Sequence, residues 1–174
     1  MRYNPEIHHR RSIRLKEYDY SQCGGYFINI CTKNRECYFE KYSVLKNIIK
    51  TEWENIPNRY PHIELDEYVI MPDHFHGIIF VVGAGLAPAQ NNVLHDRFHW
   101  ATARVAPTIG DVVGSFKSRC VVEWLKYISK NNINEFGKFW QRNYYEHIIR
   151  NEPELNRIRE YIINNPIQWQ LDKN

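Results

Sequence analysis

Hydrophobic residues along the chain follow two different periods, and each period predicts a different kind of element. Four short stretches are rich in apolar, β-branched and aromatic residues, which predicts β-strands. These stretches cover residues 26–32, 63–71, 74–82 and 144–149. The second and third are joined by Pro72 and Asp73, a connection tight enough for an antiparallel pair. A short return strand is also predicted at Cys37-Tyr38-Phe39, after a turn.

Two further segments place apolar residues at the spacing of an amphipathic helix. The first, 44–53, should stop before Pro57, because the residue ahead of a proline disfavours helical geometry. The second, 108–130, begins with Thr108 and Asp111 in an arrangement similar to a capping box. Both helices therefore have a start or stop signal as well as an apolar face.

A last helix is predicted from Asn151, which can cap it, to about Asn165, because Pro166 follows. The element order is then strand, helix, strand, strand, helix, strand, with one helix appended. This order predicts an α+β fold of the ferredoxin-like kind, an antiparallel sheet with helices mainly on one face. Residues 1–174 are expected to form one domain, with a basic N-terminal arm at 1–22 and a loop insertion at 83–108.

Composition narrows the class of protein without naming its function. Hydrophobic residues make up 43% and charged residues 25%, which is typical of a soluble globular domain. No apolar stretch is long enough to cross a membrane, so no membrane association is expected. The four cysteines lack the spacing of a zinc site and are interpreted as free thiols, which favours the cytoplasm.

Positive charge is concentrated in two parts of the chain, although the net charge is only +3. Residues 115–150 contain seven Lys or Arg against three Glu, and clustered cations are what phosphate contacts require. The alternative for each residue alone is an ordinary solvated surface. The candidate DNA-binding residues are Arg10, Arg11, Arg14, Lys117, Arg119, Arg142 and Arg150.

His74 and His76 are two residues apart in a predicted strand, so both imidazoles should lie on one face of the sheet. Neighbouring imidazoles on a fixed strand form a partial metal site. The alternative is that both are surface histidines on an edge strand.

Tyr161 and Asn165 are four residues apart and share one face of the last helix. A cation held by two imidazoles and an amide oxygen keeps positions open for phosphate oxygens. A tyrosine hydroxyl beside such a site can attack phosphorus and form a phosphotyrosine. Tyr144 and Tyr145 are rival nucleophiles, although neither has a ligand-type residue one helical turn away.

The sequence around these residues resembles a known family. His74-Phe75-His76 resembles the His-hydrophobe-His (HUH) motif of single-tyrosine transposases of the insertion-sequence-200-like superfamily, and the REP-associated branch is the most similar. Three other stretches match that branch, and together the resemblance covers about residues 25–169. They are 110–118, 140–150 and 161–166.

The resemblance implies a metal-dependent endonuclease and strand transferase that acts in DNA transposition and recombination. His74, His76 and Asn165 would bind Mg²⁺ or Mn²⁺, with Asn165 where the insertion-sequence members carry Gln. Tyr161 would attack single-stranded DNA, keep the 5′ phosphate and release a 3′ hydroxyl. The implied partners are single-stranded DNA and repeat hairpins, and the active form is a monomer or a homodimer.

Two other functions stay open at this stage. One is a non-catalytic module that binds single-stranded or hairpin nucleic acid on the same sheet. The other is a two-histidine phosphoesterase for small nucleotides, which would need a second histidine motif for which His147 is a poor candidate.

Overall fold

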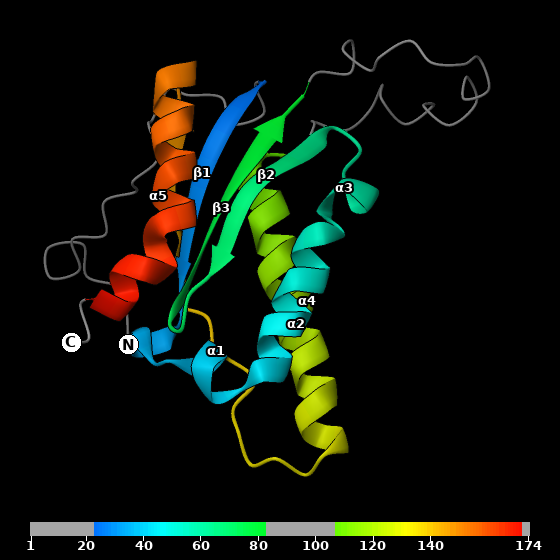
Figure 1. Ribbon diagram of the computed structural model, residues 1–174. Coiled ribbons are helices and arrows are strands. Elements are labelled where there is room, and N and C mark those ends of the chain that lie inside the picture. The colour runs from blue at the N-terminus through cyan, green and yellow to red at the C-terminus, as the bar shows by residue number, and fades with distance from the viewer. Residues whose placement is uncertain (1–22, 83–106, 172–174) are drawn as a thin grey trace, which may run out of the picture.

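The computed structural model describes residues 23–82 and 107–171, and these form one four-stranded antiparallel sheet flanked by helices (Figure 1). The strand order is β2-β3-β1-β4. The strands are β1 (Gly24–Cys31), β2 (Ile63–Ile70), β3 (His74–Val81) and β4 (Tyr145–Ile149). The helices are η1 (Lys33–Arg35), α1 (Tyr38–Lys41), α2 (Ser43–Glu54), α3 (Ile56–Arg59), α4 (Ile109–Lys130) and α5 (Glu152–Leu171). The predicted ferredoxin-like α+β order and its appended helix are confirmed.

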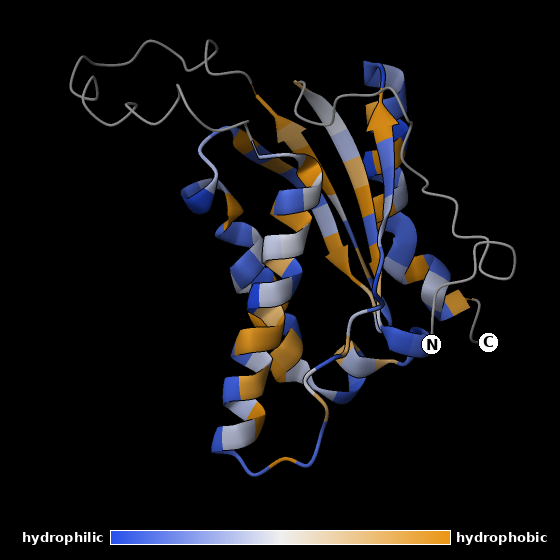
Figure 2. Ribbon diagram, turned by 180° about the vertical axis from the view of Figure 1, so that it is seen from behind, coloured by the Kyte–Doolittle hydropathy of each residue, from blue (hydrophilic) through white to orange (hydrophobic). Residues whose placement is uncertain are grey.

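The main hydrophobic core lies between the sheet and the helices α2 and α4. Alternation along β3 sends Phe75, Ile79 and Val81 into this core, where Phe75 packs against Trp53 of α2 and Phe116 of α4. Apolar residues lie along the strands and in stripes on the helices (Figure 2). Burial of these large rings, together with the aliphatic residues around them, removes apolar surface from water and stabilises this face.

The opposite face of the sheet is covered by α5, with a smaller apolar cluster. Phe27 of β1 and Ile78 of β3 pack against Ile162 of α5, and all three are buried. The other residues of β3 on this face are the two histidines and Phe80. The helix therefore covers the part of the sheet that carries the predicted metal ligands.

Several predicted boundaries are confirmed. The capping box at the start of α4 is present, since the Thr108 N–H donates to Asp111 Oδ2 at 2.9 Å and the Asp111 N–H donates to Thr108 Oγ1 at 3.3 Å. Helix α2 ends at Glu54, and Pro57 occupies the first turn of α3. No helix of the described ranges is long and apolar enough to span a membrane.

The predicted return strand at 37–39 is wrong, because Tyr38 begins the short helix α1. Both edges of β1 are already paired, one with β3 and the other with β4, so no strand position beside β1 remains. The helix buries Tyr38 and Phe39 against Phe139 instead.

The predicted end of the last helix near Asn165 is also wrong, because α5 continues through Pro166 to Leu171. A proline inside a helix removes one hydrogen bond and costs about 3 kcal/mol in an isolated helix. Here α5 bends in its last part (Figure 1), and beyond the proline the ring of Trp169 packs 6.0 Å from the ring of His74. This contact helps to offset the cost of the proline.

Candidate active site

The two histidines lie side by side on the face of the sheet that α5 covers. Their ring centroids are 4.5 Å apart, and only 5% of His74 and 1% of His76 is exposed. Strand β3 is an inner strand between β2 and β1, which excludes the alternative of surface histidines on an edge. Two imidazoles are thus held on a rigid element, as the sequence predicts.

Asp73, just before β3, fixes the orientation of His74. The carboxylate is buried, with Oδ1 2.5 Å from His74 Nδ1 and Oδ2 2.9 Å from Arg35 Nε. Because Nδ1 of His74 is engaged in this way, Nε2 is the ring nitrogen that remains for a ligand. Sequence reasoning missed the roles of Asp73 and Arg35, and the available signal was an acidic residue directly ahead of the paired histidines.

Burial keeps both imidazoles neutral. It lowers the pKa of His76 to about 3, with smaller contributions from His74 and the Arg35 guanidinium. Burial also lowers the pKa of His74, although the Asp73 carboxylate opposes this. Neutral imidazoles carry the lone pair that a metal ion needs.

Helix α5 brings Tyr161 to the histidine pair. Its hydroxyl oxygen lies 3.3 Å from His76 Nε2, and its ring packs edge-on against His76 and Phe27. The side chain is 51% exposed, so a large substrate can reach the hydroxyl. The structure therefore joins two residues that are 85 positions apart in the sequence.

Asn165 is half-buried and lies on the same side of α5. It is one helical turn from Tyr161, which contacts His76, and one turn from Trp169, which contacts His74. The helical repeat thus puts Asn165 between the two residues that touch the histidines. Among the described residues, no group of three or more His, Cys, Asp or Glu could hold a metal ion.

The rival tyrosines lie in different surroundings. The Tyr144 hydroxyl donates to Glu146 Oε2 at 2.7 Å. Tyr145 is 46% exposed and lines a hollow of about 400 Å³ beside Tyr161. His147 also lines this hollow, with Nε2 2.9 Å from Glu154 Oε1. Of these three tyrosines, Tyr161 is the one whose hydroxyl contacts the histidine pair.

An ion pair docks α5 onto the sheet close to Tyr161. Arg159 Nε donates to Asp66 Oδ1 at 3.1 Å, and Arg159 Nη2 donates to Asp66 Oδ2 at 2.5 Å. The Arg159 guanidinium lowers the pKa of Asp66, so the contact stabilises the fold above the ordinary aspartate pKa of about 3.9. This contribution is lost as pH falls through the lowered pKa.

We expect Asp66→Asn to lower the free energy of local opening of α5 at pH 7 by about 1 kcal/mol. The effect is no larger because the ion pair is partly exposed and screened by solvent. Amide hydrogen exchange should quicken about fivefold in α5 but not in α4. In the wild type, the same loosening should appear only when the pH is lowered below the Asp66 pKa. Unchanged exchange in α5 of the variant would show that the ion pair does not hold the helix.

The predicted DNA-binding residues separate into distinct groups. Arg10, Arg11 and Arg14 lie outside the described residues, as does most of the predicted 83–108 insertion. Lys117 and Arg142 line one groove, and Arg150 is exposed between β4 and α5.

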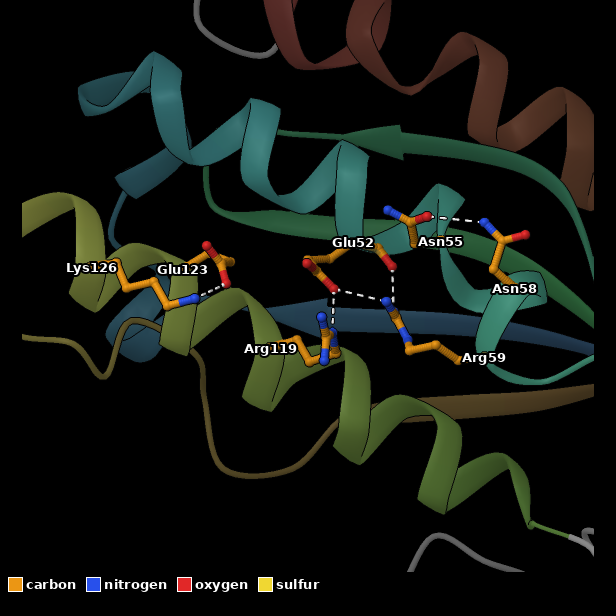
Figure 3. A network of polar contacts seen from close by, with 7 residues as sticks. All are labelled: Glu52, Asn55, Asn58, Arg59, Arg119, Glu123 and Lys126. Atoms are coloured by element: carbon orange, nitrogen blue, oxygen red, sulfur yellow. Dashed lines mark hydrogen bonds and ion pairs between the residues drawn. The ribbon is translucent and has the colours of Figure 1, made fainter.

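Arg119 lies between α4 and α2 (Figure 3). These two helices pack on the face of the sheet opposite to the one that carries the histidines. Its Nε donates at 2.8 Å to Glu52 Oε2, which also accepts from Arg59 Nη1 at 3.0 Å. Glu52 is 6% exposed, and both arginines neutralise its charge. Arg119 therefore joins two helices and is not part of the surface around Tyr161.

Comparisons with known proteins find a relative by sequence and others by structure for this chain. No family model matches it. A Haemophilus influenzae protein, described as uncharacterized, is 44% identical over 179 residues, which is 99% of this chain and 96% of the relative. A solved structure of the REP-associated tyrosine transposase bound to a REP hairpin matches 91% of this chain and 74% of its own, with a TM-score of 0.53 and 16% identity. A Deinococcus radiodurans structure, provisionally assigned as a transposase, matches 88% and 97% with a TM-score of 0.44 and 19% identity.

The two kinds of likeness support different statements. Identity of 44% over nearly the full length of both proteins shows common descent. At 16% identity, the likeness to the transposase–hairpin structure shows the fold, as the sequence resemblance implies. The chain belongs to the family of the Haemophilus influenzae protein and has the fold of the REP-associated tyrosine transposase.

Proposed function

We propose that this protein is a transposase-type enzyme, a metal-dependent endonuclease and strand transferase for single-stranded DNA. The observation that carries the proposal is the 3.3 Å contact between the Tyr161 hydroxyl and His76, on a helix that also carries Asn165. The transposase with the same fold was solved with a REP hairpin, which supports a DNA hairpin as the substrate.

In the proposed reaction, Tyr161 Oη attacks the phosphorus of one phosphodiester. A bond forms between this oxygen and phosphorus, and the bond from phosphorus to the 3′ oxygen breaks. The 3′ oxygen takes up a proton, and the tyrosine proton passes to water, which the half-exposed side chain can reach. The 5′ phosphate stays on Tyr161, and attack by a 3′ hydroxyl reverses the step.

The residues present fit a divalent cation. His74 keeps Nε2 available, and Nδ1 of His76 is buried without a hydrogen-bond partner in the described structure. His74, His76 and the amide oxygen of Asn165 would hold Mg²⁺ or Mn²⁺, with imidazole favouring Mn²⁺. When bound, the cation would polarise the phosphate and stabilise its developing charge.

Tyr161 and the histidines meet within one chain, so one protomer holds all the proposed catalytic groups. We therefore propose that the protein acts as a monomer with its tyrosine in cis. The four free cysteines support the separate proposal that it acts in the cytoplasm.

The test is incubation with end-labelled hairpin DNA in Mn²⁺, followed by denaturing electrophoresis. We expect a protein–DNA adduct that survives denaturation and contains the DNA on the 3′ side of the cleaved bond, attached through its 5′ phosphate. Hairpin binding without any adduct would support the alternative, a non-catalytic nucleic-acid-binding module. Release of a free 5′ phosphate with no adduct would indicate hydrolysis by water.

Asp73→Asn should weaken Mn²⁺ binding about tenfold, because the carboxylate orients His74 and raises its basicity. Calorimetric titration with Mn²⁺ measures this, and melting of the metal-free variant checks that the fold is retained. Glu64→Gln, which lies on the exposed edge strand β2, is the matched control and should bind Mn²⁺ as the wild type does. Equal affinity in Asp73→Asn would rule out the orienting role.

A further inference from the structure

A groove of about 770 Å³ with a strongly positive lining runs between η1, α4 and the segment before β4. Its charged residues, called here the basic groove, are Lys33, Arg35, Lys117, Lys138 and Arg142. No Asp or Glu is among the described residues that line it. Arg35 pairs with Asp73 outside this lining, and four more cations in a lining without carboxylates favour a polyanionic ligand.

One of these cations supports the groove from within. Lys117 Nζ donates to the backbone oxygens of Gln141 and Arg142, at 2.7 Å and 3.1 Å. Burial lowers the pKa of Lys117 to about 8. Lys117 therefore holds the segment before β4 against α4, and the other cations are the ones that face a ligand.

Those other cations are accessible. Lys33, Lys138 and Arg142 are exposed, and none of them forms an ion pair within the described part of the chain. Lys33 lies more than one hundred positions before Lys138 and Arg142, so only the fold brings it to them. Trp140 and Val121 add apolar surface to the same lining.

Arg35 connects the basic groove to the histidine pair. Its guanidinium is half-exposed on the groove and also pairs with Asp73, which holds His74. Asn34 and Arg35 both have positive φ, 56° and 59°, a backbone region that costs a non-glycine residue about 1 kcal/mol or more. This strained turn places Arg35 at the junction of groove and active site.

We propose that the basic groove binds the sugar–phosphate backbone of the single strand that Tyr161 cleaves, on the side of the site marked by Arg35. This inference rests on the proposed function for the identity of the strand. The exposed cations match phosphates, and the half-buried side chain of Val121 supplies apolar surface for unstacked bases, which a duplex keeps inside. Trp140 is only 8% exposed and adds little to this surface. The groove thereby leads the strand past His74.

The experiment uses the full chain carrying Lys33→Gln, Lys138→Gln and Arg142→Gln together. Binding of a fluorescent single strand is measured by anisotropy without divalent metal over a range of salt concentrations. Because the variant lacks three cations that pair with phosphates, the slope of log K against log salt should fall by about 2, and affinity near 0.15 M salt should drop on the order of 50-fold. Lys126→Gln is the matched control, because Lys126 lies on α4 outside the groove and pairs with Glu123.

A slope and affinity equal to those of the wild type would overturn the proposal, and so would failure of the wild type to bind single strands. An equal loss for a duplex of the same sequence would overturn the preference for a single strand. The assay needs neither metal nor Tyr161. If the triple variant binds weakly and the wild type forms no adduct, the proposal for the groove is supported and the proposed catalysis is rejected.

Discussion

Tyr161→Phe is expected to abolish the covalent protein–DNA adduct, because the substitution removes only the attacking oxygen. Loss of the nucleophile leaves no route to a phosphotyrosine, so adduct yield should fall below detection, by at least about 10³-fold. The ring contacts with His76 and Phe27 remain, so the fold and hairpin binding should stay close to those of the wild type. Denaturing electrophoresis of the labelled hairpin and a binding titration measure the two quantities separately.

Tyr145→Phe is the matched control for this experiment. Tyr145 is similarly exposed and lines the same hollow, but it lies on β4, and it is Tyr161 whose hydroxyl contacts His76. We expect this variant to form the adduct at nearly the wild-type level. An adduct that persists in Tyr161→Phe and disappears in Tyr145→Phe would reverse the assignment of the nucleophile.

Gly77→Val should destabilise the protein by about 3 kcal/mol or more, because position 77 has no room for a side chain. A Cβ atom there would lie 2.5 Å from Cζ2 and 2.8 Å from Cη2 of Trp53, a ring that is fully buried. The neighbouring Phe75 ring would be 3.0 Å away, and the surrounding core leaves neither ring space to move. Urea unfolding monitored by circular dichroism gives the change in the free energy of unfolding.

Gly137→Ala is a useful comparison, because its new Cβ atom would overlap a neighbouring side chain as closely, but that side chain is free to move. The new Cβ would lie 2.5 Å from Cδ2 of Leu125, but Leu125 is 45% exposed and can turn into solvent. We expect a change within about 0.5 kcal/mol. If Gly77→Val were equally mild, β3 would be able to shift against Trp53, and the histidines would not be as rigidly placed as we infer.

Much of the architecture can be predicted from local patterns. Alternation identifies the strands, apolar spacing identifies α2 and α4, and the Thr108 capping box marks where α4 begins. The pairing of the two histidines follows from the same alternation, since His74 and His76 must share a face of β3. These predictions succeed because each depends on residues close together in the sequence, where the period of the backbone sets which side chains are neighbours.

The predictions that failed depend on contacts between distant residues. Helix α5 passes Pro166, and beyond the proline Trp169 packs on His74, a contact that no local rule includes. The stretch at 37–39 forms a helix because β3 and β4 occupy both edges of β1. The contact of Arg119 with Glu52, 67 positions away, is also invisible to local patterns, and DNA binding by Arg119 stays a prediction.

The sequence by itself determined the order of the elements, the paired histidines on one strand face, and Tyr161 with Asn165 on one helix face. Only the tertiary structure decided that these two faces meet, that Asp73 and Arg35 support His74, and that cations from three separate segments line one groove. The physical reason is that backbone periodicity fixes the direction of side chains within an element. The packing of α5 onto the sheet, through Ile162 and the ion pair of Asp66 with Arg159, decides which side chains of the two elements come into contact.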